Sequence, residues 1–389
     1  MSMKTESRGL NVAMLGHKRI PSREGGVEIV VEELAVRMVK LGHSVTCYNR
    51  KGHHVSGAEF DNDVRLVQKD GQTYYKGVRL KKVFTIQKKG FAAATSSIVG
   101  TFHAAFGKYD VVHFHAEGPA FMCWLPKLFG KRIIVTVHGL DHQRAKWSKF
   151  ASSYIMAGEQ NAVRHADEII VLSDGVKQYF KDTYGRETVF IPNGVSKPKI
   201  VPPDEIIKRF GLQKDEYVLF LGRIVPEKGL RYLANAWQKV KTDKKLVIAG
   251  GSSDTERFME ELKEICKDND SVIFTGFVQG KPLEELYSNA YIYTLPSDLE
   301  GMPLSLLEAM SYGNCCLTSD IAECAEVVED KAVLFHKSDE NDLCEKLQML
   351  CDNPDIVKKY KESASDFICK KYNWNDVVEE TLRLYKKSN

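Results

Sequence analysis

The chain has 389 residues, of which 43% are hydrophobic and 28% are charged. This composition is typical of a globular protein and argues against a disordered or fibrous chain, and the length fits two domains. The net charge is only +3, but residues 1–195 carry 28 Lys and Arg against 18 Asp and Glu, whereas residues 196–389 carry 27 against 34. A basic first half and an acidic second half indicate that the two halves meet different partners.

The cysteines and the apolar segments indicate the compartment. The nine cysteines include no CxxC pair, which argues against a disulfide framework or a structural zinc site and is typical of a reducing cytosol. The first ten residues, MSMKTESRGL, are polar and charged, unlike a signal peptide. The longest apolar stretch, 91–107, is short for a membrane span. We expect a cytoplasmic protein that is soluble or peripheral on the inner face of the cell membrane.

The first predicted elements form a βαβ unit. An apolar strand at 11–15 ends at Gly16, and the loop HKRIPSREGG follows it. Apolar residues at helical spacing then predict a helix over 27–41, and a second strand follows at 44–49. The alternation continues and predicts a doubly wound parallel sheet. The further strands of this half are predicted at 78–86, 110–115, 132–138, 168–173 and 188–194.

The pattern restarts after a Pro-rich stretch, SKPKIVPPDE at 196–205. Strands are predicted there at 217–223, 245–251, 272–278, 290–297, 315–319 and 332–336. We therefore predict two Rossmann-like doubly wound domains, 1–195 and 196–370, which face each other across a cleft. The last segment, 371–389, is a predicted helix that could pack back on the first domain. Ligands of open α/β sheets bind at the carboxyl ends of the strands.

Two basic residues follow the first strand of the second domain. Arg223 and Lys228, in LGRIVPEKG, precede a predicted helix. The N–H groups and the dipole of a helix N-terminus favour an anion, and two cations there suit a diphosphate. A pair of solvated surface charges is the alternative interpretation.

Two acids, Glu300 and Glu308, lie eight residues apart in EGMPLSLLE. Eight helical steps would separate them by roughly 12 Å. Such a separation suits neither a retaining glycosidase pair, whose carboxyls lie about 5 Å apart, nor two ligands of one metal. It suits one long ligand held at two points, with the backbone amides of Gly301, Met302, Pro303 and Leu304 near a phosphate. A capping acid and a separate helix-surface acid are the alternative.

These motifs carry a family resemblance. The E-x7-E pattern, with GRIVPEKG (222–229) and GFV (276–278) before it, resembles the donor domain of the retaining GT-B glycosyltransferases of family 4. The resemblance covers nearly the whole chain, in the order expected of that family. The motifs of the first half are GHKRIPSREGGVE (16–28), TVHGLD (136–141), ADEIIVLSDG (166–175) and IPNGV (191–195).

The resemblance implies a role for each matching position. Arg223 and Lys228 would neutralise the donor diphosphate, and Glu308 would bind the ribose hydroxyls. Glu300 and His138 would contact the transferred sugar, His138 near the reacting carbon. The remaining implied donor contacts are those of Phe277 and Val278, which would line the base pocket, and of Gly25 and Gly26, which would let a loop approach the diphosphate.

The mechanism implied by the resemblance retains anomeric configuration without an enzyme nucleophile. The departing diphosphate takes the proton of the incoming hydroxyl on the same face of the sugar. Arg223, Lys228 and the helix N-termini would stabilise this leaving group electrostatically, so no metal and no other cofactor is expected. A DxD-like string, at 61–63, is predicted to be a turn.

The acceptor is expected on the basic first domain. His17, in the first loop, and Arg144, Lys146 and Trp147, after HGLD, are predicted acceptor contacts, with plain surface residues as the alternative. Residues 71–109 carry seven Lys and Arg and no acid, and apolar stretches lie at 91–107 and 119–132. Such a surface suits anionic lipid headgroups, although solubilising charge over buried helices is an alternative. The sequence contains no basic motif interleaved with aromatic residues, so a nucleic acid partner is not expected.

We therefore predict a metal-independent, retaining hexosyltransferase-type glycosyltransferase. It would move a sugar from a nucleoside-diphosphate-sugar to a hydroxyl of a glycan or polyprenyl-linked glycan in cell-surface polysaccharide synthesis. Three alternatives stay open: a GT-B nucleotide-sugar epimerase, a catalytically silent sugar-nucleotide-binding protein and, less favoured, a dinucleotide-dependent oxidoreductase, which lacks its G-x-G-x-x-G motif. The nucleobase, the sugar, the acceptor and the oligomeric state are not predicted.

Overall fold

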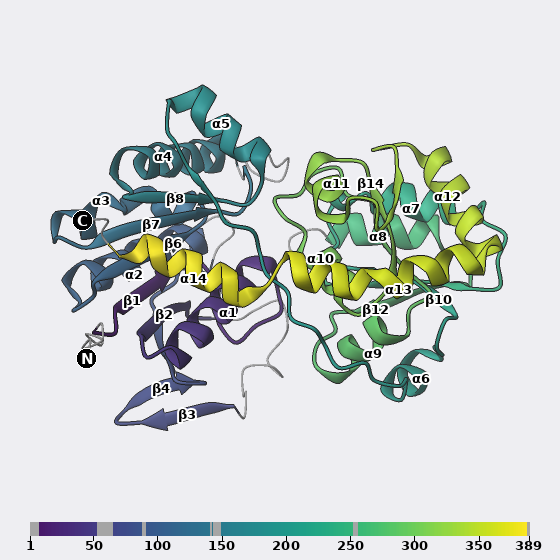
Figure 1. Cartoon of the computed structure of the whole chain (residues 1–389), viewed down its shortest axis with the longest axis horizontal. Coiled ribbons are helices and arrows are strands. Elements are labelled where there is room, and N and C mark those ends of the chain that lie inside the picture. The colour runs from purple at the N-terminus through teal and green to yellow at the C-terminus, as the bar shows by residue number, and fades with distance from the viewer. Residues whose placement is uncertain are drawn as a thin grey trace, which may run out of the picture. The chain divides into compact units, whose positions relative to one another are not determined.

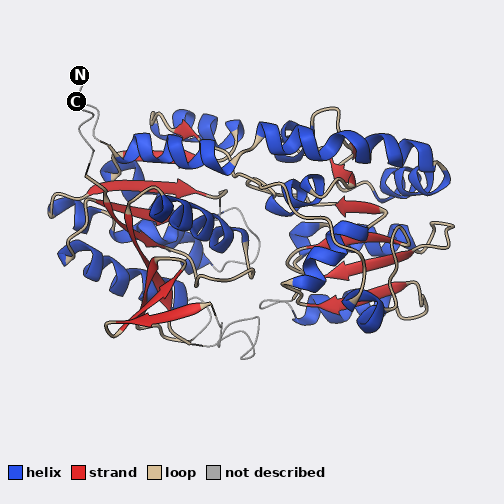
Figure 2. Cartoon of the chain, turned by 60° about the horizontal axis from the view of Figure 1, so that its bottom comes forward, coloured by secondary structure: helices blue, strands red, loops and turns tan. Residues whose placement is uncertain are grey.

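The computed structural model describes residues 8–52, 65–87, 91–140, 142, 149–251 and 256–386. It divides into two compact units, Met1–Pro192 with Trp374–Asn389, and Asn193–Asn373. The division falls three residues before the boundary predicted from the sequence. Each unit is a sheet of mainly parallel strands covered by helices (Figures 1 and 2). The predicted doubly wound α/β fold is confirmed.

The first unit is built on a sheet ordered β3-β4-β5-β2-β1-β6-β7-β8-β9, nine strands among the described residues. From β5 to β9 neighbouring strands run parallel, whereas β3 and β4 pair as an antiparallel hairpin at the edge. The strands are β1 (Asn11–Leu15), β2 (Ser44–Arg50), β3 (Leu66–Lys69), β4 (Gln72–Tyr75), β5 (Val78–Val83), β6 (Val111–His115), β7 (Arg132–Val137), β8 (Glu168–Val171) and β9 (Val189–Phe190).

Helices cover both faces of this sheet. They are α1 (Gly26–Lys40), α2 (Phe91–Phe106), the 3-10 turn η2 (Gly118–Met122), α3 (Trp124–Leu128), α4 (Lys149–His165), α5 (Asp174–Tyr184) and α14 (Trp374–Tyr385). On one face Leu15, Phe114 and Val135 form a buried core with Ala104 of α2, and α4 and α5 add to it. On the other face α14 packs beside α1 and across the strands (Figure 1). The chain's last helix thus completes the fold begun by its first residues.

The second unit has a parallel sheet ordered β12-β11-β10-β13-β14-β15. Its strands are β10 (Tyr217–Leu221), β11 (Lys245–Ala249), β12 (Val272–Gly276), β13 (Ile292–Leu295), β14 (Cys315–Ser319) and β15 (Val333–Phe335). Its helices are α6 (Glu205–Phe210), η4 (Pro226–Lys228), α7 (Leu230–Trp237), α8 (Glu256–Ile265), α9 (Lys281–Asn289), α10 (Leu304–Ser311), α11 (Ala322–Val328), α12 (Glu340–Asp352) and α13 (Pro354–Lys371).

Several strands are shorter than their apolar runs predicted. The run at 78–86 is a strand only to Val83, and the run at 188–194 pairs only at Val189–Phe190. The run at 290–297 is a strand only over Ile292–Leu295. The residues of this run that follow Leu295 leave the sheet at the carboxyl end of β13 and begin the loop that leads to Glu300. Among the described helices, none has both the length and the hydropathy needed to span a bilayer.

The nine cysteines share a chemical state. None of them is in a disulfide, and the six at positions 47, 123, 266, 315, 316 and 324 are buried. Burial raises the pKa of every one of these thiols, for example that of Cys315 to about 12. At neutral pH the thiolate, which is the reactive form, is therefore scarce.

Candidate active site

The second unit brings two loops together where its strand order reverses. β10 lies between β11 and β13, and ligands of open α/β sheets bind at such a switch point. The loop after β10 ends at Gly229, whose φ is +68° and whose added Cβ would lie 1.7 Å from the carbonyl oxygen of Pro296, just after β13. The amide of Asp298 also donates to the carbonyl of Glu227 at 2.9 Å. Only glycine permits this close contact, which fixes the two loops side by side.

An ion pair joins these loops. The ammonium of Lys228 donates to Oε1 of Glu300 at 2.5 Å, and their side chains are 13% and 10% exposed. The Tyr232 hydroxyl donates to the Asp298 carboxylate at 2.5 Å and so secures the same loop. The sequence predicted both Lys228 and Glu300 as site residues, and the structure places them in direct contact. The pair is largely shielded from water, which strengthens the interaction compared with an exposed pair.

Helix α10 carries the second acid. Pro303 caps this helix, and Gly301, Met302, Pro303 and Leu304 are all buried at its start. The amides of Leu306 and Leu307 donate to the Pro303 carbonyl at 3.0 and 3.2 Å. The N–H groups of the first turn, those of Leu304 and Ser305, precede any acceptor within the helix and suit an anion. Glu308 lies inside α10 and accepts a hydrogen bond from the Tyr287 hydroxyl at 3.3 Å. Along the chain, Glu300 therefore precedes the start of α10 and Glu308 lies one turn inside it.

Sequence reasoning gave no role to Asn193, which proves to hold the loop before α10. Its amide N–H contacts Sδ of Met302 at 3.0 Å, and its side-chain Nδ2 donates to the Met302 carbonyl at 3.2 Å. Asn193 is 4% exposed. It belongs to the IPNGV motif, which the sequence singled out, but a contact across 109 positions was not visible there.

The predicted base contacts lie further along the same sheet edge. Phe277 and Val278 follow β12, two strands from β10, and Val278 is buried while Phe277 is half-buried. Arg223 lies two residues after β10 and is half-buried. These three residues share the carboxyl edge of the sheet with Lys228 and Glu300, but they are not part of that ion pair.

The first unit has its own switch point, at β1 between β2 and β6. Gly16 follows β1 with φ +108°, and an added Cβ would lie 2.1 Å from the carbonyl oxygen of His115. The next residue, His17, is 1% exposed and forms a 3.0 Å hydrogen bond with Oδ1 of Asn49. Burial lowers the pKa of His17 to about 4, although Glu28 opposes this shift. His17 is therefore neutral at physiological pH and buried, and its predicted contact with the acceptor stays a prediction.

Glu28 shapes the glycine turn at the start of α1. Gly25 caps α1 and Gly26 begins it. An added Cβ at Gly25 would lie 2.6 Å from Oε2 of Glu28, while Oε1 of Glu28 accepts from the amide of Lys18 at 2.8 Å. The 4% exposed Glu28 thus ties the loop back onto its own helix. The role predicted for Gly25 and Gly26 at the diphosphate is not tested by these contacts.

Three histidines form a row beside β6 and β7. His138 follows β7, and its Nε2 is 3.1 Å from Nδ1 of His115, with the two rings stacked at 5.4 Å. His113 bonds through Nδ1 to the hydroxyl of Tyr385 on α14 and through Nε2 to that of Thr136, each at 2.7 Å. Burial lowers the pKa of His113 to about 3 and that of His115 well below its usual value. The buried, neutral His115 thus contacts the half-buried His138 and helps to fix its ring.

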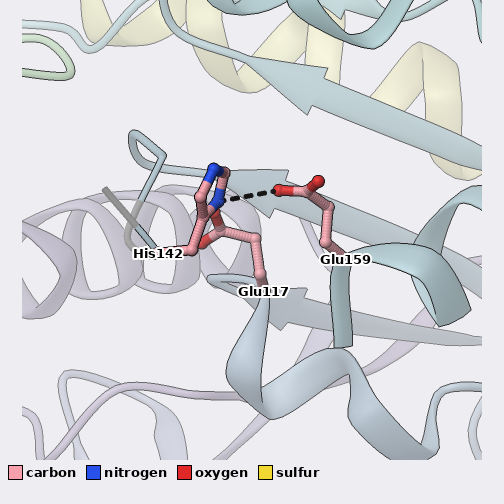
Figure 3. Close-up of side chains that lie close together, drawn as sticks. All are labelled: Glu117, His142 and Glu159. Carbon is pink, nitrogen blue, oxygen red and sulfur yellow. Dashed lines mark ion pairs between the residues drawn. The ribbon is translucent and has the colours of Figure 1, made fainter. Parts of the chain in front are cut away.

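Two acids and a histidine cluster in the first unit (Figure 3): Glu117 precedes η2, His142 follows the HGLD motif and Glu159 lies in α4. Nδ1 of His142 is 3.4 Å from Oε2 of the buried Glu159, and Glu117 completes a set whose ligand atoms lie within 4.8 Å of one another. Such a set could hold a metal ion. Hydroxyls of Tyr179 and Tyr184 already donate to the other oxygen of Glu159. The cluster belongs to the first unit and contains none of the predicted donor residues.

Four sequence predictions fall outside the described residues. These are the acceptor contacts predicted for Arg144, Lys146 and Trp147, and the turn predicted at 61–63.

Two family models match the chain in succession. One, described as Glycosyltransferase Family 4, matches residues 24–197, and the other, described as Glycosyl transferases group 1, matches residues 203–385. The chain belongs to the GT-B glycosyltransferases. The predicted family and the predicted enzyme class are thus confirmed.

Known glycosyltransferases resemble this one along their whole length. An uncharacterised glycosyltransferase of Methanocaldococcus jannaschii is 24% identical and covers 97% of this chain and 98% of its own. Among solved structures, sucrose-phosphate synthase from Thermosynechococcus elongatus matches with a TM-score of 0.79 at 21% identity, over 97% of this chain and 98% of that one. HepE of Anabaena, solved with UDP and glucose, matches with a TM-score of 0.77 at 13% identity, over 96% and 98%. At these identities the solved structures establish the fold alone.

Proposed function

We propose that this glycosyltransferase takes its sugar from a nucleoside-diphosphate-sugar. The observation that carries the proposal is the Lys228–Glu300 pair, held at a strand-order switch point beside the start of α10. A shielded ammonium and the first N–H groups of a helix suit a diphosphate, and a nearby carboxylate suits the hydroxyls of a sugar. The match to HepE, which was solved with UDP and glucose, supports the same donor class.

Each donor residue then has a part. Arg223, Lys228 and the backbone N–H groups of Gly301, Met302 and Leu304 bind the diphosphate, and Pro303, which has no N–H, lies between them. Glu300 contacts the transferred sugar, and Glu308, inside α10, binds the ribose hydroxyls. The remaining assignments are Phe277 and Val278 at the base, and Gly25 and Gly26 at the diphosphate.

The binding of a donor changes the partner of Lys228. In the structure its ammonium is neutralised by Glu300. A diphosphate offers that ammonium a stronger anion, which releases the Glu300 carboxylate to accept hydrogen bonds from the sugar. The exchange couples occupancy of the phosphate site to readiness of the sugar site.

We further propose transfer with retention and without a metal. Lys228, Arg223 and the α10 amides stabilise the departing diphosphate, whose oxygen takes the proton of the acceptor hydroxyl on the face that it leaves. His138, supported by His115, contacts the sugar near the reacting carbon. The acceptor is a glycan or lipid-linked glycan of cell-surface polysaccharide synthesis, with His17, Arg144, Lys146 and Trp147 as its proposed contacts.

A thermal-shift panel tests the donor class. UDP, GDP, ADP and dTDP are added to the full chain with EDTA and then with magnesium. A diphosphate at a hundredfold excess over its Kd stabilises by about 2.7 kcal/mol. We expect one diphosphate to raise the Tm in EDTA, and Arg223→Ala to abolish the shift. No shift at millimolar nucleotide would refute the donor site, and a shift that needs magnesium would refute metal independence.

The stereochemistry is tested separately. The donor identified by the panel, as its nucleotide-sugar, is incubated with an acceptor, and the anomeric proton of the product is read by NMR. The coupling constant of the donor's own anomer is expected in the product. The opposite anomer would exclude retention.

A further inference from the structure

Exposed apolar side chains gather on one part of the first unit. Twelve large hydrophobic side chains are exposed among the described residues, and seven of these lie between residues 84 and 129. A scattered distribution would need no explanation, but this concentration does.

Helix α2 carries three of these seven exposed side chains. Phe91, Phe102 and Phe106 are 54%, 45% and 67% exposed. Their spacing of 11 and 4 residues places them on one stripe of the helix. The opposite stripe, with Gly100 and Ala104, is buried against the sheet. The helix therefore has a second apolar side that its own unit leaves uncovered.

Helix α3 extends the stripe. Leu128 and Phe129, at its carboxyl end, are 74% and 48% exposed. The ring of Phe129 packs edge-on against that of Phe106, with centroids 4.7 Å apart. These contacts join the two helices into one surface, the α2–α3 face, defined by Phe91, Phe102, Phe106, Leu128 and Phe129.

Basic residues border the α2–α3 face. Lys108 lies two residues after the end of α2 and Lys131 two residues after Phe129, and neither forms an ion pair within the part of the chain that the structure describes. Lys127, which precedes Leu128, is 40% exposed and pairs with Asp167 at 2.5 Å. On the sheet side, Lys81 shares with Val83 the face of β5 that α2 covers, and its ammonium lies 5.6 Å from the centre of the Tyr48 ring. Residues 71–109 contain no acid, and Asp110 follows them. Lys108 and Lys131 therefore offer positive charge that no ion pair within the described residues neutralises.

The charge distinguishes between two occupants of this face. A second copy would bring its own lysines against these, because the same border repeats on each copy, so like charges would meet. A bilayer with anionic lipids supplies negative headgroups to the border and a hydrocarbon boundary to the aromatic rings. Exposed Phe and Leu flanked by unpaired Lys are the features that interfacial binding needs.

We propose that the α2–α3 face docks this glycosyltransferase on the surface of an anionic lipid bilayer. Phe102, Phe106 and Phe129 enter the headgroup boundary, while Lys108 and Lys131 contact headgroup phosphates. The proposal concerns a surface that contains no donor residue. The proposal does not depend on the donor assignment, and vesicle binding tests it without any nucleotide.

Vesicle flotation with the full chain provides the test. Vesicles of phosphatidylcholine alone are compared with vesicles that also contain phosphatidylglycerol, at low and at physiological salt. We expect flotation with phosphatidylglycerol vesicles only, and weaker binding at higher salt. Phe106→Ser with Phe129→Ser should weaken binding at least about tenfold. Lys108→Glu with Lys131→Glu should weaken it at least about thirtyfold.

Matched controls come from the end of α1, on the opposite face of the sheet. Leu41 is 62% exposed and Lys40 is exposed beside it. Leu41→Ser and Lys40→Glu remove the same kinds of group and should leave vesicle binding unchanged. The Tm and the nucleotide-dependent shift of every variant show that the fold and the donor site are intact.

Three results would overturn the proposal. The first is failure of the parent chain to float with anionic vesicles at low salt. The second is equal loss of binding in the Leu41 and Lys40 controls. The third is a concentration-dependent dimer in sedimentation velocity that Phe106→Ser dissociates, because the face would then be covered by a second copy.

Discussion

Replacement of Lys228 by alanine tests the centre of the proposed donor site. In the structure its ammonium lies 2.5 Å from Glu300, and the two side chains are only 13% and 10% exposed. A diphosphate bound at the start of α10 would accept a hydrogen bond from this ammonium. The variant therefore removes a cation from the ligand and also leaves the Glu300 carboxylate without its partner.

The expected loss follows from this geometry. A hydrogen bond to a charged group contributes about 1.5–3 kcal/mol to binding, and the partial burial of Lys228 places it within that range. A loss of about 2 kcal/mol corresponds to a Kd roughly thirtyfold higher. The uncompensated Glu300 charge adds repulsion, so thirtyfold is the lower expectation.

Isothermal titration of the full chain with the nucleoside diphosphate that gives the thermal shift measures this change. Glu300→Gln is the matched comparison, because it breaks the same ion pair from the other side at nearly constant volume. It should bind the diphosphate as tightly as the parent chain or several-fold more tightly, since Lys228 no longer has a competing anion, while sugar transfer falls. Equal Kd values for Lys228→Ala and the parent would refute the reasoning, and so would weaker binding by Glu300→Gln.

The remaining predictions concern backbone geometry, protonation and the loop before α10. Gly229→Ala should lower the free energy of unfolding by more than about 3 kcal/mol in urea, whereas Gly185→Ala, at φ +63° with nothing within 4 Å of its added Cβ, should cost only about 1–2 kcal/mol; similar losses would contradict the predicted clash. The pKa values of His17 and His113 are lowered by burial to about 4 and about 3, so the unfolded chain takes up protons first as the pH falls below 6.5. Stability should therefore be complete above pH 6.5 and fall by about 2 kcal/mol per histidine by pH 5, and a flat urea midpoint between pH 7.5 and 5 would count against it. Asn193→Ala removes two contacts to the loop before α10 and should cost about 2 kcal/mol in urea and weaken diphosphate binding, with unchanged binding as the opposing result.

Local sequence patterns predicted much of the fold. Apolar runs and glycines gave the strands of the two parallel sheets and their order along the chain. The β3–β4 hairpin is absent from the predicted elements because its strands, LVQK and QTYY, are mostly polar or exposed. A signal was present in the turn between them, since Asp70 and Gly71 both have positive φ and Asp-Gly is typical of tight hairpins.

Local patterns also gave the residue types of the site but not its contacts. Lys228 and Glu300 were predicted separately, from a helix start and from a pair of acids. Their ion pair spans 72 positions and depends on β10 lying next to β13, which no local period reveals. The same limit applies to His113, which bonds to Tyr385 across 272 positions. Whether such a histidine is a ligand contact or a core residue is decided by the helix that returns to cover it.

The state of the thiols makes this enzyme convenient for fluorescence spectroscopy. Because burial raises the pKa of all nine cysteines, a maleimide dye at neutral pH should react slowly with the native chain. A single cysteine introduced by Phe106→Cys would be more exposed than any of them, since Phe106 is 67% exposed. A polarity-sensitive dye at that one position could then report arrival at a lipid surface in real time, without first rebuilding the protein as a cysteine-free variant.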